Sequence, residues 1–172
     1  MGYTAEVAVS DDHLIVAQRV HQAPTDNGSL PVMTEATEQE CGERPQVVLA
    51  DSGYYSMENI KSVEASGIEV FVPDPLLARE LQGGIAAPVM NARQRRRTPG
   101  LHEMRERLRS PAGCAQYRRR KGLVESVFGT LKQQRGMRQF RRRGLVAVGT
   151  EWALATTAFN LTRLFVATSR TL

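Results

Sequence analysis

The sequence predicts an α/β protein, and three patterns along the chain lead to this class. Residues 3–9 and 14–20 are two β-rich runs on either side of the polar turn Ser10-Asp11-Asp12-His13, which predicts a β-hairpin. Two short apolar runs, 46–50 and 68–72, flank a segment with helical features, which predicts a β-α-β unit. Helical periodicity then dominates the carboxyl-terminal third of the chain.

Between the hairpin and the β-α-β unit lies a loop with Pro24, Asp26, Asn27 and Gly28, followed by a predicted helix over residues 29–41. Pro31 is compatible with this helix because proline is tolerated in a first turn. The next run, 46–50, is apolar without alternation, as in a strand covered on both faces.

The end of that run is chemically informative, because it is followed at once by Asp51-Ser52-Gly53. Asp51 is therefore expected at the carboxyl end of a strand. Ser56 is suited to cap a helix running to about residue 65, and Gly67 is suited to end it.

From about residue 73 to 116 the pattern loosens, and we interpret this segment as a basic insertion or long excursion with a short helix near 102–108. Helical periodicity resumes over 117–135, where an apolar stripe predicts one face packed on the core. The stripe consists of Val124, Val127, Phe128 and Leu131. A long helix is predicted after Gly144, with a broad apolar face that should be well buried and with Trp152 as a core anchor.

Composition bounds the class of protein. With 172 residues, 41% of them hydrophobic and 24% charged, the chain has the make-up of a folded protein with one expected core. The net charge of +5 is unevenly distributed. Residues 93–143 hold 17 Lys and Arg against three Glu, a difference of 14, so the rest of the chain is acidic overall. This asymmetry favours a polyanionic partner, with nucleic acid first and membrane second.

Several functional classes are disfavoured. Cys41 and Cys114 stand alone, which excludes zinc-ribbon spacing and a disulfide framework. The histidines, His13, His21 and His102, are dispersed and are predicted to be surface residues. The longest apolar stretch, 152–168, is interrupted by polar residues, and no signal peptide opens the chain, so we expect no membrane partner and a cytoplasmic location.

Two acids have a setting that suggests catalysis. Asp51 follows a predicted strand, where open α/β sheets place reactive groups. Glu125 shares a helical face with Lys121 and Lys132, by the 3.6-residue period. Two carboxylates from different elements suit Mg²⁺ or Mn²⁺ in phosphoryl transfer, with the lysines on phosphates. The alternative is structural: Asp51 caps the turn after its strand, and Glu125 offsets the arginines around it.

A resemblance favours the catalytic interpretation. The segments Val-Leu-Ala-Asp51-Ser-Gly-Tyr-Tyr and Tyr117-Arg-Arg-Arg-Lys-Gly-Leu-Val-Glu125-Ser-Val-Phe-Gly-Thr-Leu-Lys132 resemble the DDE transposases of bacterial insertion sequences. The residues that follow are similar to the tail of the IS1182-like group in that class. They are Arg-Gly-Met-Arg-Gln-Phe from 135, Arg-Gly-Leu from 143, Glu-Trp-Ala-Leu from 151 and Phe-Asn-Leu from 159.

The resemblance implies a ribonuclease H-like mixed sheet flanked by helices, in which three acids bind two Mg²⁺ or Mn²⁺ ions. These ions would support strand cleavage and strand transfer at transposon ends and target DNA, with a homodimer as the possible working form. Asp51 matches the second Asp of this motif, Glu125 its Glu, and Lys132 the lysine seven residues later. Lys121 stands where related enzymes often carry an arginine, and Tyr117 lies eight residues before Glu125 where the related pattern has seven. The predicted DNA contacts are Tyr117, Arg118, Lys121, Lys132, Arg135 and Arg138.

The first Asp of this motif is not found. In the resembled family it lies on the first, central strand, ahead of the hairpin that here begins almost at residue 1, and Asp11 and Asp12 are predicted to be solvated turn residues. We therefore expect residues 1–172 to be a partial catalytic domain missing that strand, truncated and inactive alone. Two alternatives stay open: a non-catalytic module that binds DNA or a transposase, and a remnant without function.

Overall fold

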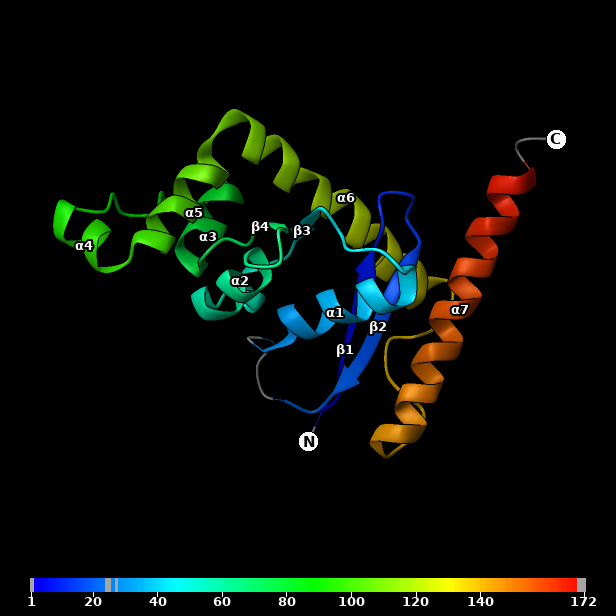
Figure 1. Ribbon diagram of the computed structural model, residues 1–172. Coiled ribbons are helices and arrows are strands. Elements are labelled where there is room, and N and C mark those ends of the chain that lie inside the picture. The colour runs from blue at the N-terminus through cyan, green and yellow to red at the C-terminus, as the bar shows by residue number, and fades with distance from the viewer. Residues whose placement is uncertain (1, 24–25, 27, 170–172) are drawn as a thin grey trace. The chain divides into compact units, whose positions relative to one another are not determined.

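The computed structural model describes residues 2–23, 26 and 28–169, and it confirms the α/β class (Figure 1). Two compact units are present within these residues. Unit 1 comprises residues 2–23, 36–43 and 121–169, and unit 2 comprises 26, 28–35 and 44–120. Each unit has its own cluster of buried hydrophobic side chains, whereas composition led us to expect a single core.

Unit 1 contains the predicted hairpin. Strand β1 (Thr4–Val9) pairs antiparallel with β2 (Ile15–His21). The register shifts between Ala8 and Val9. The turn is closed by hydrogen bonds from the amide of Ser10 to the carbonyl of Leu14, at 2.9 Å, and from the amide of Leu14 to the Ser10 hydroxyl, at 3.2 Å. Of the loop expected after the hairpin, Pro24 and Asn27 lie outside the described residues.

The helices of unit 1 cover this hairpin with the stripe that the sequence predicts. Helix α6 (Pro111–Gln133) begins in unit 2 and buries Val127 and Leu131 in unit 1. Helix α7 (Leu145–Ser169) adds Trp152 and Phe159, and the core of this unit also contains Ile15. The side chain of Asn160 joins α7 to β2, because it accepts from the amide of Ile15 at 2.9 Å and donates to its carbonyl at 2.8 Å.

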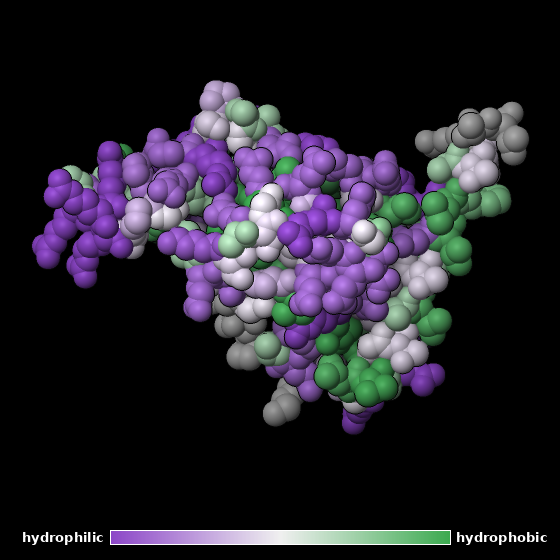
Figure 2. Space-filling model, viewed as in Figure 1, coloured by the Kyte–Doolittle hydropathy of each residue, from purple (hydrophilic) through white to green (hydrophobic). Residues whose placement is uncertain are grey.

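The prediction that the broad apolar face of α7 is well buried is wrong for half of the helix. Trp152 is 3% exposed, which confirms it as a core anchor. The opposite side of the helix is open to solvent, and green apolar surface runs along α7 in Figure 2. The exposed apolar residues of this side are Val146, Leu154, Leu161, Leu164 and Phe165. Periodicity alone had merged two apolar stripes, one buried and one exposed, into a single broad face.

Unit 2 contains the predicted β-α-β unit. Strand β3 (Val47–Leu49) pairs in parallel with β4 (Glu69–Phe71), and helix α2 (Met57–Glu64) connects them. Ser56 caps α2 by accepting from the amide of Asn59, and Gly67 has the positive φ of 82° that ends the connection. The three residues of β3 are half-buried, so this strand is not covered on both faces as its unbroken apolar run predicted.

Helix α1 (Ser29–Cys41) has the predicted bounds and is shared by the two units. The strands form two separate two-stranded sheets in the described part of the chain, β1-β2 and β3-β4. The α/β class is thus confirmed at this level. The ribonuclease H-like arrangement and the partial domain over 1–172 stay predictions.

The segment expected to be a loose excursion is largely helical. It forms α3 (Pro75–Leu81), α4 (Ala92–Arg97) and α5 (Pro99–Arg109), and α6 starts within it. Leu77, Met104 and Leu108 are buried in the core of unit 2. Three prolines of this segment, Pro75, Pro99 and Pro111, stand at helix starts, where a missing amide proton costs nothing and a fixed φ is suited to the first turn.

Candidate functional site

Asp51 lies at the carboxyl end of β3, as predicted, and takes part in two interactions. Its Oδ1 accepts from the amide of Gly53 at 2.9 Å and caps the short 3₁₀ helix η1 (Ser52–Tyr54). Its Oδ2 lies 3.9 Å from Nη1 of Arg120, and 52% of the Asp51 side chain is exposed. One carboxylate oxygen is therefore used by the turn, and the other faces a cation.

Arg120 and Tyr117 complete this group in unit 2. The Arg120 guanidinium lies 5.6 Å from the centroid of the Tyr117 ring, as helical i, i+3 spacing allows. Burial raises the pKa of Tyr117; Arg120 opposes this shift, and the charge of Asp51 adds to it. Nε of Arg120 is buried and has no hydrogen-bond partner among the described residues. Asp51, Tyr117 and Arg120 thus form a polar cluster with a guanidinium donor still available.

Sequence reasoning missed Arg120 because it is one of four consecutive cations, residues 118–121, that composition does not distinguish. Its spacing from Tyr117 was the available signal. Arg118, next to Tyr117 in the same helix, is exposed.

Glu125 lies on the unit 1 part of α6, where its side chain is exposed. Lys121 and Lys132 are exposed as well, and helical spacing puts all three on one face. Nζ of Lys132 lies 5.5 Å from the centroid of the Phe128 ring, which holds this ammonium at the edge of the core. Each unit therefore contains one of the two predicted metal ligands.

The remaining predicted DNA contacts, Arg135 and Arg138, differ in whether their guanidinium groups are bonded to other parts of the chain. Arg138 is exposed. Arg135 donates through Nη2 to the carbonyl of Ala158 and to the hydroxyl of Thr162, so its guanidinium is tied to α7. Arg135 thus has a structural role in addition to any role on a phosphate.

A second acid follows a strand in unit 2 and was not singled out from the sequence. Asp74 comes after β4 and is 5% exposed. It accepts from Arg105 at both oxygens, each at 2.8 Å, and caps α3 through the amides of Leu76 and Leu77. Although burial alone would raise it, hydrogen bonds from Arg105 lower the pKa of Asp74 overall. The Asp-Pro pair at the start of a helix was the signal for a cap.

The prediction that the three histidines are surface residues is wrong for His21, which is 5% exposed. Its Nε2 lies 3.3 Å from Oε1 of Glu6, which is itself buried. Thr4 pairs with His21 in the hairpin register, so Glu6 and His21 lie on the same face of it two residues apart. The strand alternation could have placed them together, whereas their burial depends on packing from other elements.

The described helices include none that is both long and apolar enough to cross a membrane. Among curated proteins and solved structures, no significant match to the chain is found. Residues 88–165, somewhat less than half of the chain, match the family of the transposase DDE domain. The matched segment includes Lys121, Glu125 and Lys132, and it does not extend to Asp51. This similarity supports a DDE transposase and, with it, DNA transposition and a DNA substrate.

Proposed function

We propose that this chain takes part in DNA transposition by metal-dependent phosphoryl transfer, as strand cleavage and strand transfer at the ends of an insertion sequence. The observation that carries the proposal is the match of residues 88–165 to the transposase DDE domain, with Glu125 inside the matched segment. The concentration of positive charge in residues 93–143 supports a polyanionic substrate.

In this proposal Asp51 and Glu125 are the catalytic residues and ligands of Mg²⁺ or Mn²⁺. The residue types fit, because these hard cations prefer carboxylate oxygens, and the cap of η1 uses only Oδ1 of Asp51. When bound, such ions polarise the phosphoryl group and stabilise the attacking and leaving oxygens. A third carboxylate is not assigned among the described residues.

The cations near these acids would position the DNA backbone. Lys121 and Lys132 have exposed ammonium groups on the face of α6 that contains Glu125. Tyr117, Arg118 and Arg138 complete the proposed contacts. Arg135 would contribute mainly by its hydrogen bond to the carbonyl of Ala158, which ties it to α7. Contacts of this kind supply affinity and register without reading base sequence. The IS1182-like group and a homodimer remain parts of the proposal.

The proposal is tested by Mn²⁺ titration calorimetry of the whole chain. Asp51→Asn and Glu125→Gln each remove one ligand charge at nearly constant volume, so each should weaken binding by at least about tenfold. Glu103→Gln is the matched control, because Glu103 is also exposed on a helix in the basic segment and is expected to leave metal binding unchanged.

Two results would count against a metal site built on these acids. One is the absence of Mn²⁺ binding by the unaltered chain at millimolar metal, and the other is equal binding by all three variants. Because only two acids are assigned, we expect no metal-dependent nicking of DNA by the chain alone, and measurable strand transfer would show that a third acid was overlooked.

A second candidate function is a non-catalytic module that binds DNA, and the turn after β3 favours it. The hydrogen bond from Gly53 gives Asp51 a structural role as a cap. On this hypothesis Asp51→Asn lowers the free energy of unfolding by about 1 kcal/mol or less and leaves metal affinity unchanged. Glu125→Gln then preserves or slightly strengthens DNA binding, since it removes a negative charge from a basic surface.

A further inference from the structure

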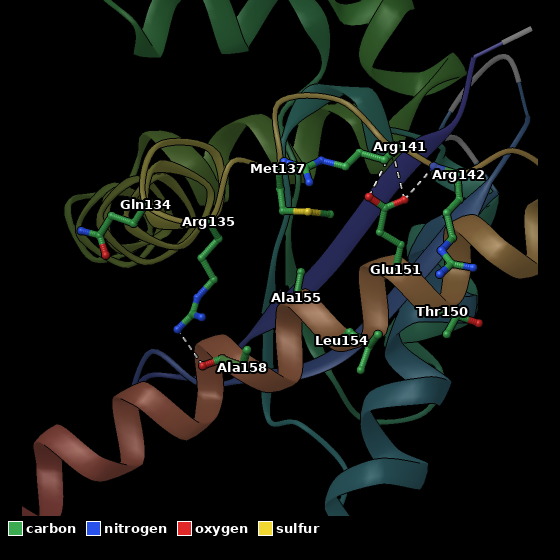
Figure 3. Close-up of a pocket in the computed structure, with 10 residues that line it drawn as sticks. All are labelled: Gln134, Arg135, Met137, Arg141, Arg142, Thr150, Glu151, Leu154, Ala155 and Ala158. Carbon is green, nitrogen blue, oxygen red and sulfur yellow. Dashed lines mark hydrogen bonds between the residues drawn. The ribbon is translucent and has the colours of Figure 1, made fainter.

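Residues 135–144 of the connection between α6 and α7 form the basic loop, and one carboxylate holds its arginine-rich end. Glu151, in the second turn of α7, accepts from the amide of Arg141 at both oxygens, each at 3.1 Å, and from the amide of Arg142 at 3.1 Å (Figure 3). Amides that point at one carboxylate fix the backbone of the loop at its arginine-rich end.

Other contacts fix the rest of the basic loop. The amide of Gly144 donates to the hydroxyl of Tyr3 at 2.8 Å, and Gly144 has a φ of 88° that favours glycine. The ring of Phe140 packs edge-on against Tyr3 and Trp152, with centroids 6.2 and 6.1 Å apart. The loop is thus anchored on the core of unit 1 rather than suspended in solvent.

Apart from Arg135, which is bonded to α7, the arginine side chains of this anchored loop are unengaged among the described residues. Arg138, Arg141, Arg142 and Arg143 are exposed, and in the described part of the chain their guanidinium groups have no hydrogen bond or ion pair. A protein surface with four adjacent cations and no counter-charge on their side chains is suited to phosphate groups.

A hollow of about 550 Å³ lies between the loop and α7. Met137 and Ala155 form part of its apolar floor, and Arg141 and Arg142 stand beside it (Figure 3). A second hollow, of about 640 Å³, includes Lys132 in its lining as well as cations of the loop. Both hollows therefore border the basic loop and are lined by cations. One of these cations is Lys132, already proposed as a phosphate contact.

We propose that the basic loop is a preformed site for the phosphodiester backbone of DNA and that Glu151 is the positioning residue that sets it. The proposal rests on the function proposed above and assigns a further part of the DNA surface. A carboxylate among arginines opposes DNA electrostatically, so its presence needs another reason, and its three backbone hydrogen bonds supply one. Ordering the loop before binding lowers the entropic cost of binding.

The test compares Glu151→Gln with Glu103→Gln in DNA binding by the whole chain, measured by fluorescence anisotropy in a chelating buffer. Both variants remove one negative charge, which by itself strengthens DNA binding or leaves it unchanged. If Glu151 positions the loop, Glu151→Gln instead weakens binding by about tenfold, because charge-assisted hydrogen bonds are lost. Equal affinity of the two variants would overturn the role of Glu151.

A double variant, Arg141→Gln with Arg142→Gln, keeps the proposal testable if Glu151→Gln unfolds, because Glu151 binds the backbone amides that this variant retains. The slope of log affinity against log salt should fall by about one for each lost phosphate contact. An unchanged slope in the double variant would refute the site. The site would also be refuted if the double variant lost binding to anionic lipid vesicles but bound DNA as tightly as the unaltered chain. The chelating buffer removes divalent metal ions. A change in DNA binding in this assay therefore reports on the basic loop and not on the metal site proposed above.

Discussion

At the scale of single residues, the two aspartates that follow the paired strands of unit 2 have different chemical capacities. Asp74 is 5% exposed, and both of its oxygens are taken by Arg105. The Asp51 side chain is 52% exposed and keeps one oxygen outside its cap. An acid can bind a metal ion only through an accessible oxygen, so the structure favours Asp51 over Asp74 as a ligand.

Tyr55 interacts electrostatically with Asp74 and Arg105, and its altered pKa affects stability at high pH. Burial, with a further contribution from Asp74 and against the opposing effect of Arg105, raises the pKa of Tyr55 from 10.0 to about 12. The folded pKa lies above the unfolded value, so this contribution to stability is fully present below pH 10 and is lost as pH rises through about 12.

We expect one tyrosine of the folded chain to ionise near pH 12 in an ultraviolet titration of phenolate, and Tyr55→Phe should remove that late step. If Tyr55→Phe leaves the titration curve unchanged above pH 11, the burial described for this phenol is wrong.

At the scale of elements, α7 has two apolar sides with different surroundings. One side contributes Trp152 and Phe159 to the core, and Nε1 of Trp152 donates to the carbonyl of Glu6 at 3.2 Å. The other side is solvent-exposed, and Phe165 on it is 72% exposed. The same residue types thus contribute to stability on one side of the helix only.

Urea unfolding should separate the two sides. Trp152→Ala is expected to lower the free energy of unfolding by about 3–5 kcal/mol, because it empties a packed site and removes a hydrogen bond. Phe165→Ala, an aromatic deletion in the same helix, should change it by about 0.5 kcal/mol or less. A large loss for Phe165→Ala would mean that this side of α7 is covered in solution.

At the scale of the whole molecule, the chain builds two cores rather than one. Unit 2 contains the β-α-β unit and the helices that follow it, and unit 1 contains the hairpin with most of α6 and all of α7. Leu108 and Leu131 are fully buried, one in each core. Local stability is therefore expected to vary between the units.

Hydrogen exchange monitored by mass spectrometry tests this division. Leu108→Ala and Leu131→Ala should each cost about 2–5 kcal/mol, because each leaves a cavity in a packed core. We expect the first to reduce amide protection mainly in unit 2 and the second mainly in unit 1. Uniform loss of protection across the chain in both variants would indicate one cooperative core.

Much of the local structure could be predicted because it depends on residues close in the chain. The hairpin turn, the helix over 29–41, the Ser56 cap and the positive φ of Gly67 are set by neighbouring residues. Asp51 could be placed at a strand end for the same reason, since the apolar run stops beside it. The stripe of α6 followed from helical period alone.

Other features were decided only in the tertiary structure. Periodicity shows which side chains share a face, and it does not show which faces become covered, because covering elements are distant in sequence. For this reason the exposed side of α7, the burial of His21 and the two cores could not be predicted. Two contacts of the candidate sites were likewise decided by the tertiary structure. Arg120 lies beside Asp51, 69 positions away in the sequence, and Glu151 anchors the basic loop through Arg141, 10 positions away.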